Sequence, residues 1–168
     1  MSWLHSAVGQ YLRTTAQHAQ AHNHLEQALD ITEASYEPDH PEVAIDLNNL
    51  AQLLQDTSRY EEAEPLMRRA LDITEASYGP DHPTVATHLN NIAQLLQATN
   101  RYQEAEPLMR RQVEIFVAFT KRTGHEHPHL RAALANYMGL LQAMGRSEEE
   151  IRAASAALLQ RGADNAEE

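Results

Sequence analysis

Residues 41–55 read Pro41-Glu-Val-Ala-Ile-Asp-Leu-Asn-Asn-Leu-Ala-Gln-Leu-Leu-Gln55, a segment with a regular apolar pattern. Its large apolar residues are spaced by four, three and four positions, and they are Val43, Leu47, Leu50 and Leu54. This spacing places them on one side of an α-helix. Pro41 suits the first turn, where a backbone N–H is not needed. The segment therefore predicts an amphipathic helix with one buried side.

The same segment returns 42 residues later with few changes. When residues 27–68 are aligned with residues 69–110, 33 of 42 positions are identical. The similarity is weaker on both sides of these two central repeats. Internal repetition at this period is typical of a tandem helical array, in which worn terminal repeats act as caps. We predict one all-α domain over residues 1–161 with an acidic tail at 162–168. Its parts are a degenerate stretch 1–26 and the repeats 27–68, 69–110 and 111–155, the last with a three-residue insertion.

Each repeat is expected to hold a second helix after a break at residues 56–58. Ser58 with Glu61 predicts a capping box at its start, and Asn100 with Gln103 predicts a weaker one in the next copy. The helix should run from about residue 59 to 78, before the turn that Gly79 and Pro80 begin. Its predicted buried side consists of Ala63, Met67, Ala70, Leu71 and Thr74.

Three runs carry a family resemblance: Arg59-Tyr-Glu-Glu-Ala-Glu-Pro-Leu-Met67, Tyr78-Gly-Pro-Asp-His-Pro-Thr-Val-Ala86 and Leu89-Asn-Asn-Ile-Ala-Gln-Leu-Leu96. They resemble the long tetratricopeptide repeats of kinesin light chains, and the resemblance covers roughly residues 18–152. It implies a solenoid of about three and a half helical hairpins, whose first helices line a concave groove that holds peptides. Neither central first helix contains Lys or Arg, so capture of a peptide's terminal carboxylate is not expected.

Charge and hydropathy limit the partners. The net charge of −11 opposes binding to the phosphate backbone of nucleic acid. No apolar run approaches the roughly 20 residues that span a bilayer, and the first residues lack the apolar core of a secretory signal. Without cysteine the chain has no disulfide, thiol nucleophile or thiolate metal site. We expect a cytoplasmic protein with protein or peptide partners, without nucleic acid, membrane or cofactor.

Neutral amides are the candidate binding residues. They recur on the side of the first helix opposite the apolar residues, as Asn48, Gln52 and Gln55 in one copy and as Asn90, Gln94 and Gln97 in the next. Asn49 and Asn91 lie on the flank of this side. Asparagine within a helix costs about half a kcal/mol relative to alanine, so its repetition needs a reason.

Two readings of these amides remain open. In the structural reading, Asn49 and Asn91 hydrogen-bond the backbone of the adjacent helix, and Asn136 keeps this position in the third repeat. In the functional reading, amides donate to and accept from the main chain of an extended peptide. We favour the functional reading for Asn48 and Asn90, because the third repeat replaces them with Ala135.

The ten histidines raise the question of a metal site. His40 and His82 belong to a repeated Asp-His-Pro turn and are interpreted as residues that begin helices. His18, His22 and His24 form one cluster, and His125, His127 and His129 form another. A histidine pair without a carboxylate or thiolate is an incomplete zinc site, so we predict no metal.

No enzyme signature is present: phosphate loop, nucleophile elbow and paired catalytic residues are all absent from the sequence. We expect a non-catalytic module that binds an extended peptide. The alternative is a structural scaffold that self-associates through its terminal helices. Ile151, Ala154, Leu158 and Leu159 form an apolar side of the last helix with no following repeat to cover it, so this helix is either a thin alanine-rich cap or a dimer seam. Trp3, the single tryptophan, either caps the first helix or fills an end of the groove.

Overall fold

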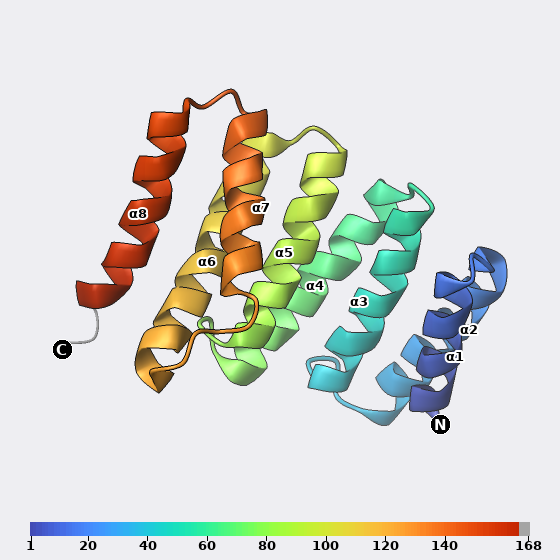
Figure 1. Ribbon diagram of the computed structural model, residues 1–168. Coiled ribbons are helices and arrows are strands. Elements are labelled where there is room, and N and C mark those ends of the chain that lie inside the picture. The colour runs from blue at the N-terminus through green and yellow to red at the C-terminus, as the bar shows by residue number, and fades with distance from the viewer. Residues whose placement is uncertain (165–168) are drawn as a thin grey trace. The chain divides into compact units, whose positions relative to one another are not determined.

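The computed structural model describes residues 1–164, and all regular structure within them is helical (Figure 1). The helices are α1 (Ser2–Thr14), α2 (His18–Ser35), α3 (Pro41–Asp56), α4 (Tyr60–Tyr78), α5 (Pro83–Ala98), α6 (Tyr102–Thr123), α7 (Leu130–Ala143) and α8 (Glu148–Asp164). The expected all-α hairpin architecture is confirmed. The expected tail begins within α8, and residues 165–168 of it lie outside the described residues.

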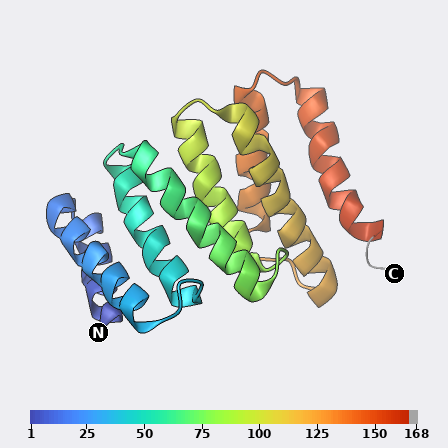
Figure 2. The same cartoon turned by 180° about the vertical axis from the view of Figure 1, so that it is seen from behind.

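The helices pack as consecutive antiparallel pairs, which both ribbon views show for α1 with α2 and for α3 with α4 (Figures 1 and 2). The chain divides into two compact units, the first ending at Pro80 and the second beginning at Asp81. The first unit holds α1 to α4, and the second holds α5 to α8. The loosely matching residues 1–26 supply α1 and the first part of α2, and these two helices form a complete pair. The described helices therefore make four pairs where three and a half were expected.

The predicted apolar side of α3 is buried. Val43, Leu47, Leu50 and Leu54 are at most 6% exposed, and their counterparts on α5 are buried as well. Val43 and Leu47 pack in one cluster with Ala70 and Ile73 of α4. On α4 the prediction needs one correction, because Ile73 is buried and Leu71 is only half-buried.

The predicted capping boxes at Ser58 and Asn100 are wrong. Both residues have φ of 60°, so each ends the preceding helix. The N–H of Arg59 donates to the carbonyl of Leu54 at 2.8 Å, which closes the end of α3. Helix α4 then begins without a side-chain cap. Sequence spacing alone cannot distinguish a residue that ends one helix from a residue that begins the next.

A capping box that the sequence analysis missed lies at the start of α8. The N–H of Ser147 donates to Oε2 of Glu150 at 2.8 Å, and the N–H of Glu150 donates to Oγ of Ser147. The bond from the Ser147 backbone holds the pKa of Glu150 below its ordinary value. The Ser-x-x-Glu spacing was the available signal.

Of the two alternatives for the apolar side of α8, the structure agrees with a cap. Ile151 and Leu158 are buried, at 8% and 4% exposure, and α8 packs on α6 and α7. Only Leu159 of the large residues in this set is exposed. The described part of α8 therefore covers its own unit as a cap, and its apolar side does not await a following repeat.

Candidate binding site

The predicted amide residues of the first unit lie along α3. Asn48, Asn49, Gln52 and Gln55 are all half-buried, so none is closed off from solvent. Asn49 has a defined partner, because its Nδ2 donates to Oγ of Ser6 in α1 at 3.0 Å. The structural reading expected a bond from Asn49 to the backbone of the adjacent helix, whereas the acceptor is a side-chain hydroxyl of α1.

A buried carboxylate organises these contacts. Asp46 is 5% exposed; its Oδ1 accepts from the Ser6 hydroxyl at 2.8 Å, and its Oδ2 accepts from the Thr32 hydroxyl at 2.6 Å. The network joins α1, α2 and α3. The sequence analysis gave Asp46 no role. The signal was a carboxylate inside an otherwise apolar helix segment, since a buried carboxylate needs hydrogen-bond donors.

The amides of the second unit lie along α5. Gln94 is exposed, and Asn90, Asn91 and Gln97 are half-buried. Oδ1 of Asn90 is buried and has no hydrogen-bond partner among the described residues. Nε2 of Gln97 donates to the carbonyl of Ala93 at 3.4 Å.

A hollow of about 350 Å³ adjoins these amides in the second unit. Gln94 and Gln97 of α5 line it, together with Asn136 and Gly139 of α7. Two of the predicted residues therefore share one concavity with Asn136, the third-repeat counterpart of Asn91. Amide groups around a hollow suit a ligand that has its own donors and acceptors.

The position of Asp46 is occupied by His88 in the second unit. His88 is 6% exposed, and its Nδ1 has no hydrogen-bond partner in the described part of the chain. Burial lowers the pKa of His88, because desolvation disfavours the charged imidazolium.

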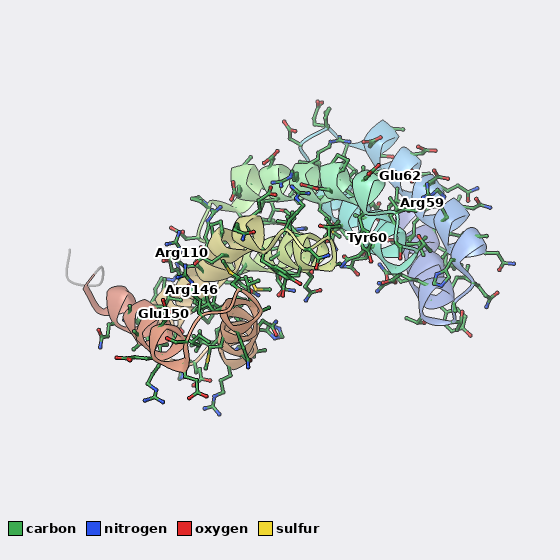
Figure 3. All side chains as sticks on the ribbon, turned by 90° about the horizontal axis from the view of Figure 1, so that it is seen from above. Arg59, Tyr60, Glu62, Arg110, Arg146 and Glu150 are labelled. Carbon is green, nitrogen blue, oxygen red and sulfur yellow. The ribbon has the colours of Figure 1, made fainter. Side chains whose placement is uncertain are left out.

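Another concavity, of about 440 Å³, lies among α6, α7 and α8 of the second unit. Tyr137 lines it and donates to Oε1 of Glu106 at 3.0 Å. Burial, assisted by this bond, raises the pKa of Tyr137 to about 12, so the phenol is a hydrogen-bond donor at neutral pH. Arg146 and Glu150, an ion pair at the start of α8, also line it (Figure 3).

The histidines serve local structure. Nδ1 of His40 accepts from the N–H of Glu42, and Nδ1 of His82 accepts from the N–H of Thr84, each at 3.2 Å. Both therefore cap helices, as the repeated turn predicted. His127 stacks on Phe116 with ring centroids 4.1 Å apart. Among the side chains that the structure describes, no three His, Asp or Glu groups are placed so that they could hold a metal ion.

Three N-terminal histidines make contacts with neighbouring ionisable side chains. His24 and His5 place their Nδ1 atoms 3.1 Å apart, and His22 contacts Glu26 at 3.0 Å.

Charged residues elsewhere also form local pairs, such as Arg59 with Glu62 at the start of α4 (Figure 3). None of the described helices combines the length and apolar character needed to cross a bilayer.

Comparison with known proteins gives a family match. The sequence profile of the family described as "Tetratricopeptide repeat" matches residues 1–76 and 46–116. No curated protein sequence matches significantly.

Solved structures of the same architecture are similar. The nearly identical TPR-like repeats assigned to a kinesin light chain of Podosopora anserina superpose with a TM-score of 0.73 at 23% identity. That match covers 94% of this chain and 83% of the other. BtubC (BKLC) of P. vanneervenii gives 0.77 at 20% identity, over 97% of this chain and 62% of that one. Aspartyl phosphate phosphatase F of Bacillus subtilis gives 0.75 at 17% identity, over 97% and 41%. At these identities the likeness concerns the fold.

Proposed function

This chain belongs to the tetratricopeptide repeat family, and from that premise we propose a non-catalytic interaction module that binds an extended segment of a partner protein. The binding residues are the amides Asn48, Asn49, Gln52 and Gln55 of α3 and Asn90, Asn91, Gln94 and Gln97 of α5. The observation that carries the proposal is their exposure: none is fully buried, and each set lies on a first helix whose apolar side is buried.

The chemistry of the amides suits a peptide backbone. Each side-chain amide offers two N–H donors and a carbonyl acceptor, which match the alternating groups of an extended chain. Recognition of this kind depends on shape and main-chain bonds, so side-chain specificity has to come from other residues. The net charge favours neutral or basic partners and opposes nucleic acid. Cytoplasmic location and independence from membranes stay expectations.

Replacing Asn48 and Asn90 together by alanine tests the proposal. A phage-displayed library of random 12-residue peptides is panned on the protein, and recovered peptides are resynthesised for affinity measurements. Loss of two hydrogen bonds of about 1 kcal/mol each predicts roughly 10-fold to 30-fold weaker binding. The melting temperature should stay nearly unchanged.

A matched control is Gln20→Ala on the exposed surface of α2, which should leave peptide affinity as it is. If the library yields no peptides, or if the recovered peptides bind the double variant as tightly as the wild type, the proposal fails.

Self-association is the second candidate function, and the exposed surface of α1 favours it. Leu4 and Tyr11 are 47% and 66% exposed, and Met1 is 89% exposed. Apolar side chains at the end of a helical array can stack on another copy of the chain. In this case α1 would form the contact, and the amides would have no ligand.

A further inference from the structure

A hollow of about 290 Å³ in the first unit lies between α1 and α3, and we refer to it as the α1–α3 hollow. Trp3, Ser6 and Gln10 line it from α1, and Glu42, Ile45 and Asp46 line it from α3. It adjoins the proposed peptide-binding amides, because Asn49 donates to the Ser6 hydroxyl. Its chemistry can therefore select a side chain of a bound segment.

Two large apolar side chains of this hollow are open to solvent. Trp3 is 72% exposed and Ile45 is 50% exposed. Neither is needed to fill the core of the unit, since Val43, Leu47 and their neighbours do so. Exposed aromatic and aliphatic groups beside a concavity favour a ligand with apolar surface.

The charge in the hollow is negative. Asp46 is 5% exposed and accepts hydrogen bonds from two hydroxyl groups, and Glu42, on the same helix, is exposed. Residues 1–80 contain four arginines and no lysine. Each arginine already forms an ion pair outside the hollow: Arg13 with Asp56, Arg59 with Glu62, Arg68 with Glu64 and Arg69 with Glu33. No Lys or Arg side chain of this unit therefore neutralises the two carboxylates.

The two near-identical copies differ in the residues of this hollow. Only nine of the 42 aligned positions differ, and all three hollow residues of α3 are among them. Glu42, Ile45 and Asp46 correspond to Thr84, Thr87 and His88. The apolar core of the helix is almost unchanged between copies. Two of the three changes lie at exposed positions, Glu42 and Ile45, and the third replaces the buried Asp46 by the buried His88.

We propose that the α1–α3 hollow binds a Lys or Arg side chain of the partner segment. The aliphatic stem packs on Ile45 and the cation lies over the Trp3 indole. The cation forms an ion pair with Glu42 and is also attracted by the negative charge of the buried Asp46. An acidic or purely apolar side chain would leave these carboxylates without a counter-charge. This inference rests on the proposed function and adds the chemistry that the amides do not supply.

Trp3 makes the test direct, because it is the only tryptophan of the chain and its fluorescence reports on the hollow. Peptides recovered from the random 12-residue library should be enriched in Lys or Arg, and their titration should change the Trp3 emission. Replacing the basic residue of such a peptide by norleucine keeps the stem and removes the charge. We expect this peptide to bind the wild type about 10-fold more weakly.

The variant Glu42→Thr with Ile45→Thr gives the hollow two residues of the second copy. Both positions are exposed, so folding should persist, and circular dichroism checks it. The variant should bind the basic peptide about 10-fold more weakly and should no longer distinguish it from the norleucine peptide. Glu61→Gln removes an exposed carboxylate of α4 in the same unit and should change neither affinity.

The outcomes separate this inference from the proposed function. Peptides that need Asn48 and Asn90 but are indifferent to norleucine, or to the Glu42 and Ile45 changes, overturn the inference and leave the proposed function standing. A library that yields no peptides overturns both. Enrichment of acidic peptides also contradicts the inference.

Discussion

One buried position holds different ionisable residues in the two copies. Asp46 accepts hydrogen bonds from Ser6 and Thr32, whereas His88 has an Nδ1 without a partner among the described residues. Both carboxylate oxygens of Asp46 therefore have a hydroxyl donor. The imidazole is buried without a counter-charge, and its pKa is lowered by desolvation. The buried imidazole therefore makes the fold of the second unit sensitive to acid.

Removing His88 should reduce the sensitivity of the fold to acid. The unfolded chain binds a proton near the ordinary histidine pKa of about 6.5, whereas the folded chain does so only at lower pH. The contribution of neutral His88 to the free energy of unfolding is therefore complete above about pH 6.5. It is lost as the pH falls from there toward the lowered folded-state pKa. Urea denaturation at pH 7.5 and 5.5 should show a smaller loss of stability for His88→Gln than for the wild type.

The exposed His125 supplies the control for this measurement, since His125→Gln also removes a histidine but not a buried one. It should keep the wild-type dependence on pH. Some dependence should remain in His88→Gln, because burial and the nearby His129 also lower the pKa of His127. Equal losses of stability in His88→Gln and the wild type would contradict the assignment.

At the scale of helices, the first pair packs with a different combination of residues from the next two. Gly9 of α1 faces Leu25 of α2, and the corresponding pairs are Ala51 with Met67 and Ala93 with Met109. All six residues are buried. A Cβ added at Gly9 would lie 2.6 Å from Cγ of Leu25. The branched leucine requires glycine opposite it, whereas the unbranched methionine leaves room for alanine.

Gly9→Ala should destabilise the protein by about 1–3 kcal/mol through overpacking. Adding Leu25→Met should recover much of this loss, because the double variant recreates the combination of the other pairs. Urea denaturation measures both.

Gly139→Ala is the matched control, because no atom lies within 4 Å of a Cβ added at Gly139 in α7. A gain of about 0.5–1 kcal/mol is expected there, since alanine has the higher helix propensity. A destabilisation at Gly9 that Leu25→Met leaves unchanged would show that another contact decides the spacing of α1 and α2.

At the scale of the molecule, the net charge of −11 affects any association between copies. If α1 mediates self-association, the mean mass from light scattering should rise toward that of a dimer with concentration. The rise should be larger at high salt, because screening weakens the repulsion between two acidic chains. Leu4→Gln with Tyr11→Gln should abolish it. A monomer at every concentration and salt level would rule out this second candidate.

The presence of helices and the buried sides of α3 and α5 could be predicted from residue spacing. In a helix, the direction of each side chain around the axis follows from its position in the sequence. The ends of the helices were harder to predict from the sequence. Ser58 has the right spacing for a cap, but its positive φ makes it the end of α3. The amides of α3 and α5 are half-buried or exposed, and their role in binding stays a prediction. The bond from Asn49 to Ser6 joins residues 43 apart and needs the two helices in contact.

The repeat itself, the all-helical class and the acidic character follow from the sequence, since periodicity and charge are properties of the chain. Only tertiary packing decided that Asp46 is buried between hydroxyls, that Ile151 and Leu158 face inward, and that Trp3 and Ile45 flank one hollow. These features arise where side chains of different helices meet. The distance between such helices depends on the volumes of all the residues packed between them.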